Sequence, residues 1–207
     1  MTFIRRANAW VLRIRYIALE IPRRALRLFL CSVFGLDRWH VAAGVNKPYV
    51  ADVIRFLEAQ RVGVIVEVGS GFCDLICGVR ANRRIAYDAD PGVVRAAKLY
   101  TAAKMSRVEV RQHDFVAAGV PKVQGDVWLF VNWIHAYSEE KIRPLLRSVF
   151  ESLEDGGMII LDMVSRPSYP HQHDPRRIFK GLHFDLKLVG GQYPDGRSVF
   201  AVIKRSC

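Results

Sequence analysis

The chain has 207 residues, of which 51% are hydrophobic, and this is ample for the core of one domain with appendages. Lys and Arg number 31 against 20 Asp and Glu, which gives a net charge of +11 at pH 7. The four cysteines lack the paired spacing of a disulfide framework or a zinc site, which predicts a reduced, cytoplasmic setting and no bound metal.

The positive charge is concentrated at the two ends of the chain. Residues 1–40 hold eight Arg and two acids, and residues 165–207 hold eight bases and three acids. A basic rim around a nearly neutral middle predicts an anionic partner, such as lipid headgroups, nucleic acid or an acidic substrate. Solubility alone is the alternative explanation.

The first predicted element is an amphipathic helix from Phe3 to Ile21, followed after Pro22 by a second helix that continues to Gly35. Arginines interrupt the apolar stretches, which excludes both a secretory signal and a transmembrane span. An apolar stripe flanked by arginines favours a helix lying on an anionic membrane surface. The alternatives are a lid packed on the domain and a contact in a homodimer.

The next feature is a buried strand that ends in a glycine turn. An apolar run from Val62 to Val68 precedes Gly69 and Gly71, which allow a sharp turn and the close approach of a flat ligand. A second strand ends in Asp88, 19 positions after Gly69, where a nucleoside site places the carboxylate for the ribose. Asp74 would repel a pyrophosphate, so the pattern disfavours a dinucleotide.

Further helices and strands alternate along the rest of the chain. Proline and serine positions predict helices that begin near Pro48, Pro91 and Ser138. Apolar runs predict strands at 108–111, 126–132 and 158–161, and then two strands at 184–189 and 198–203 with no helix between them. The last two strands must therefore pair antiparallel or lie two positions apart.

The order of these motifs resembles that of the class I S-adenosylmethionine-dependent methyltransferases, from about Val62 to Lys204. The resemblance rests on five short motifs: Glu67-x-Gly69-x-Gly71, Asp88, His113-Asp114-Phe115, Asn132-Trp133-Ile134-His135 and Leu153-Glu154-Asp155-Gly156-Gly157. It implies an α/β Rossmann-like fold with a seven-stranded, mostly parallel sheet and an antiparallel terminal strand. The methyltransferase domain would span 46–207, behind N-terminal helices at 1–45. Cys73 departs from the family's usual third glycine.

The resemblance also implies which residues bind S-adenosylmethionine. Its methionine end would lie near Glu67, which suits a cationic ligand, and the loop of Gly69, Ser70 and Gly71 would pass beneath it. The remaining cofactor contacts would come from Asp88 at the ribose, Ala89 and Asp90 beside the adenosine, Asp114 and Phe115 at the adenine, and Asn132 in the pocket. His135 is the candidate catalytic base, and a structural histidine at the start of a helix is the alternative.

The sequence says less about the methyl acceptor than it says about the cofactor. We expect a small-molecule, lipid-linked or glycan-linked acceptor, with the protein at the inner face of a membrane. One alternative is an RNA methyltransferase whose basic ends bind phosphates, although Asn132-Trp133-Ile134-His135 differs from the signature of base-nitrogen methylation. Another is a non-catalytic scaffold. If the N-terminal helices are interfacial, a chain lacking its first 30 or so residues should still bind the cofactor.

Overall fold

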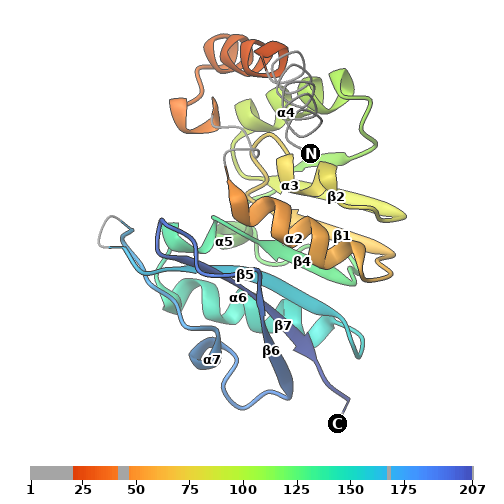
Figure 1. Cartoon of the computed structure of the whole chain (residues 1–207), viewed down its shortest axis with the longest axis vertical. Helices are drawn as coiled ribbons and strands as arrows, with labels where there is room; N and C mark the ends of the chain where they lie inside the picture. The colour runs from red at the N-terminus through yellow and green to blue at the C-terminus, as the bar shows by residue number, and fades with distance from the viewer. Residues whose placement is uncertain (1–20, 42–46, 167–168, 207) are drawn as a thin grey trace, which may run out of the picture.

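The structure is a computed structural model that describes residues 21–41, 47–166 and 169–206. A single twisted sheet carries helices on both of its faces (Figure 1). The predicted stripe from Phe3 to residue 20 lies outside the described residues. A helix over residues 21–34 and a short 3₁₀ turn, η1 (Arg38–Val41), precede the first element that packs on the sheet.

Seven strands form the sheet in the order β3-β2-β1-β4-β5-β7-β6. Their bounds are β1 (Val64–Val68), β2 (Arg83–Asp88), β3 (Glu109–Gln112), β4 (Val127–Phe130), β5 (Met158–Val164), β6 (Phe184–Val189) and β7 (Arg197–Lys204). Strands β1 to β5 are parallel, and β7 pairs antiparallel with both β5 and β6. The predicted class of fold is therefore confirmed, including its antiparallel end.

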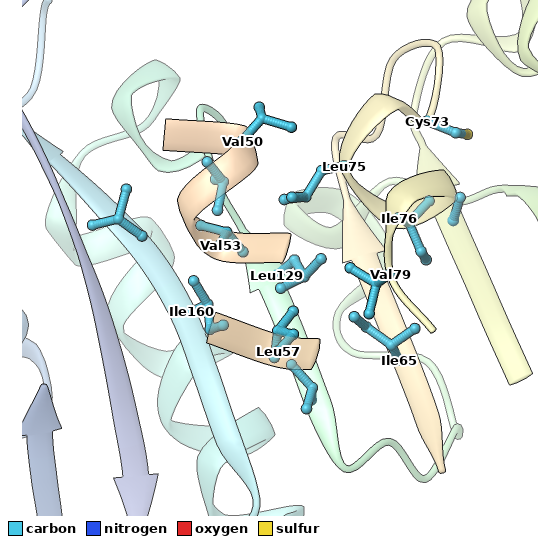
Figure 2. Packing of buried hydrophobic residues seen from close by; sticks show 14 of the residues in the cluster. Val50, Val53, Leu57, Ile65, Cys73, Leu75, Ile76, Val79, Leu129 and Ile160 are labelled. Carbon is cyan, nitrogen blue, oxygen red and sulfur yellow. The ribbon is translucent and has the colours of Figure 1, made fainter. Parts of the chain in front are cut away.

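Helices cover both faces of the sheet. They are α2 (Pro48–Glu58), α3 (Asp74–Gly78), α4 (Pro91–Ala103), α5 (Phe115–Ala118), α6 (Glu139–Ser152) and α7 (Pro175–Ile178), with a 3₁₀ turn, η3 (Ile134–Ala136). Successive residues of β1 face opposite layers: Ile65 packs with α2 and α3, and Val66 packs with α6. Figure 2 shows Val53 and Leu57 of α2 packed toward the strands.

Most predicted elements appear within a few residues of their expected positions. The four-residue helices α5 and α7 were not predicted, because each is a single turn without apolar periodicity. The strand order reverses direction between β1 and β4, and ligands of open α/β sheets bind at the carboxyl ends of the strands beside such a reversal. The topology therefore directs attention to the ends of β1, β2 and β4.

The helix over residues 21–34 packs on the domain with one face and leaves the other in solvent. Leu30 and Cys31 are buried in a cluster with Phe72, Ala96 and Tyr100. The outer face exposes four large apolar side chains, Ile21, Leu28, Phe29 and Val33. In the part of the chain that the structure describes, no helix is long and apolar enough to cross a membrane. The boundary between 45 and 46 stays a prediction.

Candidate cofactor and acceptor site

A cavity that is open to solvent lies at the carboxyl ends of β1, β2 and β4. Residues from the N-terminal helix, the start of α2, the glycine loop and the end of β4 line it together. The lining residues are Arg27, His40, Lys47, Tyr49, Val50, Glu67, Gly69, Ser70, Gly71, Phe72, Asp74, Leu75, Asp88, Val131 and Asn132. Of the eleven predicted site residues, six line this cavity: Glu67, Gly69, Ser70, Gly71, Asp88 and Asn132.

The loop after β1 has a left-handed backbone at three positions. The φ angles are 66° at Gly69, 51° at Gly71 and 61° at Cys73, the position where the resembling family has its third glycine. A Cβ added to Gly69 would lie 2.2 Å from Cδ1 of Trp133, whereas one added to Gly71 would meet nothing closer than His40 Nδ1 at 3.7 Å. Gly69 therefore makes room for Trp133, and Gly71 is the glycine with an open face.

Asp88 at the end of β2 is tied to the same loop. Its Oδ2 accepts a hydrogen bond from the Gly71 amide at 3.1 Å, and its Oδ1 accepts one from the Asp90 amide at 3.1 Å. Burial raises the pKa of the Asp88 carboxyl, while these two amides and His40 oppose that rise. Asp88 thus fixes the turn and also presents a carboxylate to the cavity.

Glu67 is a buried carboxyl at the other side of the cavity. It is 6% exposed, and its Oε2 accepts a hydrogen bond from the Ile76 amide at 3.1 Å. Burial raises the pKa of Glu67 to about 8, in spite of that hydrogen bond. Burial also lowers the pKa of the neighbouring Lys47 ammonium. A cationic ligand group beside Glu67 would restore the charged carboxylate, so the site fits the ligand that the sequence predicts.

Four predicted cofactor residues lie outside the lining of this cavity. Ala89 follows Asp88, and the Asp90 carboxylate caps α4 by accepting from the Gly92 and Val93 amides at 2.6 and 3.1 Å. Asp114 caps α5 by accepting from the Val116 and Ala117 amides. The Phe115 side chain is 2% exposed and packs edge-on against Tyr87, Trp128, Phe130 and Trp133. Their predicted contacts with the adenosine remain predictions.

His135, the predicted base, lies beside the cavity lining and not in it. Its side chain is 3% exposed, and its Nε2 lies 3.2 Å from Oδ1 of Asp162 on β5. Burial, followed by the nearby charge of Arg197, lowers the pKa of His135 to about 4, so the ring is neutral at pH 7. The contact is therefore between a neutral imidazole and a carboxylate, and the catalytic role of His135 stays a prediction.

Asp162 and Arg197 form the centre of a buried polar network that sequence reasoning missed. Both side chains are almost fully buried and are ion-paired with each other. Asp162 Oδ1 accepts from the Asn132 amide at 2.8 Å, and Arg197 donates to Asn132 Oδ1 and to the Tyr169 hydroxyl, each at 3.0 Å. The guanidinium carbon of Arg197 lies 4.6 Å from the ring centroid of Tyr49. The network thus links Asn132 and Tyr49 of the cavity to His135.

Arg27, His40 and Lys47 also line the cavity without having been assigned to it. Trp39-His40 precedes the first domain helix, where the resembling family often builds its lid, so it is a candidate for the substrate side. In the structure His40 lies against Phe72 and Gly71, and its role toward the substrate stays a prediction. No comparable signal marks Arg27, which is one of eight arginines in residues 1–40. Among the described residues there is no group of His, Cys, Asp and Glu that could hold a metal ion.

A family model matches most of the chain. Residues 42–187 match the O-methyltransferase domain, and this is more than half of the 207 residues. No curated protein sequence matches the chain. The similar solved structures below are all less than 25% identical to it, so their likeness concerns the fold.

Three solved structures represent these neighbours. An O-methyltransferase family protein from Burkholderia thailandensis aligns with 13% identity and a TM-score of 0.62, over 78% of this chain and 57% of its own. The N-methyltransferase NodS from Bradyrhizobium japonicum, in complex with S-adenosylhomocysteine, aligns with 14% identity and a TM-score of 0.65, over 88% of this chain and 99% of its own.

The third is magnesium protoporphyrin IX methyltransferase from Synechocystis with bound S-adenosylhomocysteine, at 12% identity and a TM-score of 0.60, over 77% of this chain and 83% of its own. The match to the Burkholderia protein covers 57% of that protein, so this chain spans little more than half of its length. On the strength of the matched family model, the chain belongs to the O-methyltransferase domain family, whose members use S-adenosylmethionine and share the class I methyltransferase fold.

Proposed function

We propose that this chain transfers a methyl group from S-adenosylmethionine to an oxygen of a small or lipid-linked acceptor. The observation that carries the proposal is the cavity that joins Glu67, the loop of Gly69 to Gly71, and Asp88 at the ends of β1 and β2. When bound, S-adenosylmethionine supplies an electrophilic methyl group, and the chain's contribution is largely to position the reactants.

Each proposed cofactor-binding residue would contact a different part of the cofactor. Asp88 holds the loop through the Gly71 amide and would accept hydrogen bonds from ribose hydroxyls. Glu67 would lie beside a cationic end of the cofactor and ionise there. Gly71 offers an open backbone face to a flat ligand. These roles require no metal ion.

His135 would act as the general base for a hydroxyl acceptor. Its ring is neutral at pH 7 but has a pKa of about 4 while it is buried, so entry of the acceptor would have to raise that pKa before the ring takes a proton. Asp162, 3.2 Å from Nε2, would stabilise the imidazolium that forms. The ring is covered by Tyr169, whose centroid lies 5.1 Å from that of His135. The acceptor would therefore reach His135 after the Tyr169 side chain moves away from the ring.

Label transfer tests the proposal. The purified chain should move a labelled methyl group from S-adenosylmethionine to hydroxyl compounds in a pool of metabolites and extracted lipids. His135→Gln should lower the transfer rate by about 10²–10⁴-fold, the usual contribution of a general base, and leave the affinity for S-adenosylhomocysteine unchanged. Glu140→Gln, a change at an exposed residue of α6, is the control. Equal rates for wild type and His135→Gln would remove His135 from the reaction.

A lipid surface is the partner that the outer face of helix 21–34 fits best. Ile21, Leu28, Phe29 and Val33 are 51–63% exposed on this face, and Arg24 is exposed on the same helix. We expect the full chain to float with anionic vesicles, and Phe29→Glu to reduce flotation. Leu188→Glu, at a residue that is 52% exposed on β6, should have no effect. If the full chain never floats, helix 21–34 does not bind a lipid surface, and the alternative of a lid on the domain remains.

A further inference from the structure

Asn132, just after β4, borders the cavity in a left-handed backbone conformation. Its φ angle is 63°, which is uncommon for a residue other than glycine. The buried network holds this conformation: the Asn132 amide donates to Asp162 Oδ1 at 2.8 Å, and Arg197 donates to Asn132 Oδ1 at 3.0 Å. The backbone and the side chain of Asn132 are therefore both fixed at the cavity wall.

The contact with Arg197 decides which way the Asn132 carboxamide is turned. A guanidinium carries only donors, so it bonds to the carboxamide oxygen and not to the NH2 group. The Nδ2 group therefore lies on the side of the carboxamide away from this contact. Among the described residues, no group accepts a hydrogen bond from Nδ2, and Asn132 is half-buried in the cavity wall. The network thus leaves an oriented hydrogen-bond donor available to a ligand.

The cavity wall around Asn132 is largely apolar. Val131 precedes it, and Tyr49 and Val50 at the start of α2 line the same cavity. Tyr49 lies close to Asn132, because the Arg197 guanidinium bonds to Asn132 and packs on the Tyr49 ring, 4.6 Å from its centroid. An apolar wall with one precisely placed polar group is typical of a site for a small molecule.

We infer that Asn132 selects a methyl acceptor that has an apolar body and a carbonyl oxygen, to which Nδ2 donates a hydrogen bond. This oxygen is separate from the hydroxyl that receives the methyl group. The inference rests on the proposed function, because it assumes that the acceptor enters at the end of β4, where the network joins Asn132 to Asp162 and His135. A donor does not suit the cationic end of S-adenosylmethionine, so Asn132 has a different role from the cofactor contact that the resemblance implies.

Two phenols that differ by one oxygen test this specificity. The ketone 4-hydroxyacetophenone has a carbonyl group where 4-ethylphenol has a CH2 group. Ligand-observed NMR titration of the full chain, loaded with S-adenosylhomocysteine, gives the affinity for each phenol. Wild type should bind the ketone about threefold or more tightly than 4-ethylphenol, the effect of one net hydrogen bond.

Two variants of Asn132 separate its donor from its structural role. Asn132→Asp keeps an oxygen for Arg197 and tolerates the left-handed backbone, but it presents a second oxygen in place of Nδ2 and should reverse the preference. Asn132→Gly suits the φ of 63°, removes the carboxamide and should bind the two phenols within about twofold of each other. Asn82→Asp, at an exposed residue before β2, should keep the wild-type preference and is the control.

S-adenosylhomocysteine affinity, measured first by calorimetry, distinguishes this inference from the proposed function. Asn132→Gly should bind S-adenosylhomocysteine within about twofold of wild type; a larger loss would assign Asn132 to the cofactor and overturn the inference. A wild-type chain that binds neither phenol or does not prefer the ketone would also overturn it, as would an Asn132→Gly variant that keeps the preference. Failure of the wild type to bind S-adenosylhomocysteine would instead refute the proposed function.

Discussion

The carboxyl ends of two pairs of neighbouring strands serve different purposes in this molecule. At the ends of β1 and β2, ionisable side chains line an open cavity: Asp88 accepts from an amide of the glycine loop, and Glu67 accepts from an amide of α3. At the ends of β4 and β5, ionisable side chains face one another and are almost fully buried. The first region is built to receive a ligand, and the second is built to hold its own charges in place.

The cost of burying a carboxylate is offset differently in the two regions. Burial raises the pKa of Glu67, and a cationic ligand beside it would lower that pKa again. Asp162 is compensated inside the protein by Arg197 and by the Asn132 amide. Changes at the first region should therefore act mainly on binding, and changes at the second mainly on folding.

The largest effect is expected at the closed network. Arg197→Met would leave the Asp162 carboxylate buried without its cation, at a cost of roughly 3–5 kcal/mol in the free energy of unfolding. Thermal unfolding should show a fall in Tm on the order of 10 °C for a domain of this size. The double variant Arg197→Met/Asp162→Asn should be more stable than the single one. A Tm equal to that of wild type would mean that the pair is not the anchor of this region.

Gly69→Val should affect both folding and binding. A β-branched side chain would have to adopt a φ of 66° and would meet Trp133 Cδ1 at 2.2 Å from its Cβ. Overpacking and backbone strain together cost roughly 2–5 kcal/mol. S-adenosylhomocysteine binding should then fall below detection in calorimetry. Gly35→Val, at a glycine with a φ of 64° and no atom near its added Cβ, controls for backbone strain alone.

Glu67 gives the cavity a pH dependence of known sign. Its pKa in the folded chain is about 8, above the ordinary 4.5, so the native state binds the extra proton and stability falls as the pH rises from about 4.5 to about 8. A cationic ligand favours the carboxylate, so affinity for S-adenosylmethionine should rise over the upper part of that range. Glu67→Gln should flatten both profiles. Parallel profiles for wild type and Glu67→Gln would show that Glu67 does not face the ligand.

Cys73→Gly should have the smallest effect. The residue has a φ of 61°, which glycine adopts without strain, but its side chain is fully buried and its Sγ lies 3.7 Å from Ser70 Oγ. The relief of strain and the lost packing oppose each other, so the free energy of unfolding should change by less than about 1 kcal/mol. Urea unfolding measures it, and a loss of several times this size would show that Cys73 is needed for packing.

The fold was predictable because its signals are local. Apolar runs such as Val64–Val68 and helix-starting prolines such as Pro91 are recognisable within a few positions, and the interval from Gly69 to Asp88 indicates the glycine loop that lines the cavity. The closed network was not predictable, because Asn132 and Arg197 are 65 positions apart and meet only through the antiparallel pairing of β5 and β7. Sequence spacing carries no information on such a contact.

The sequence did not reveal the structural role of two predicted adenosine contacts. In the structure the Asp90 and Asp114 carboxylates each cap a helix, and their contacts with the adenosine stay predictions. A carboxylate at the end of a strand thus had a structural use that the apolar pattern before it did not reveal. Arg27 was not predicted to line the cavity, because its partner Asp74 lies 47 positions away and no local pattern connects the two.

The central claim is that the cavity at the ends of β1 and β2 binds S-adenosylmethionine through Asp88. Titration calorimetry with S-adenosylhomocysteine, on wild type and on Asp88→Ala, tests it most directly. We predict one binding site on the wild-type chain and a loss of roughly 1.5–3 kcal/mol in binding free energy for Asp88→Ala, the range for hydrogen bonds to a charged group. An unchanged affinity in a folded Asp88→Ala variant would contradict the claim.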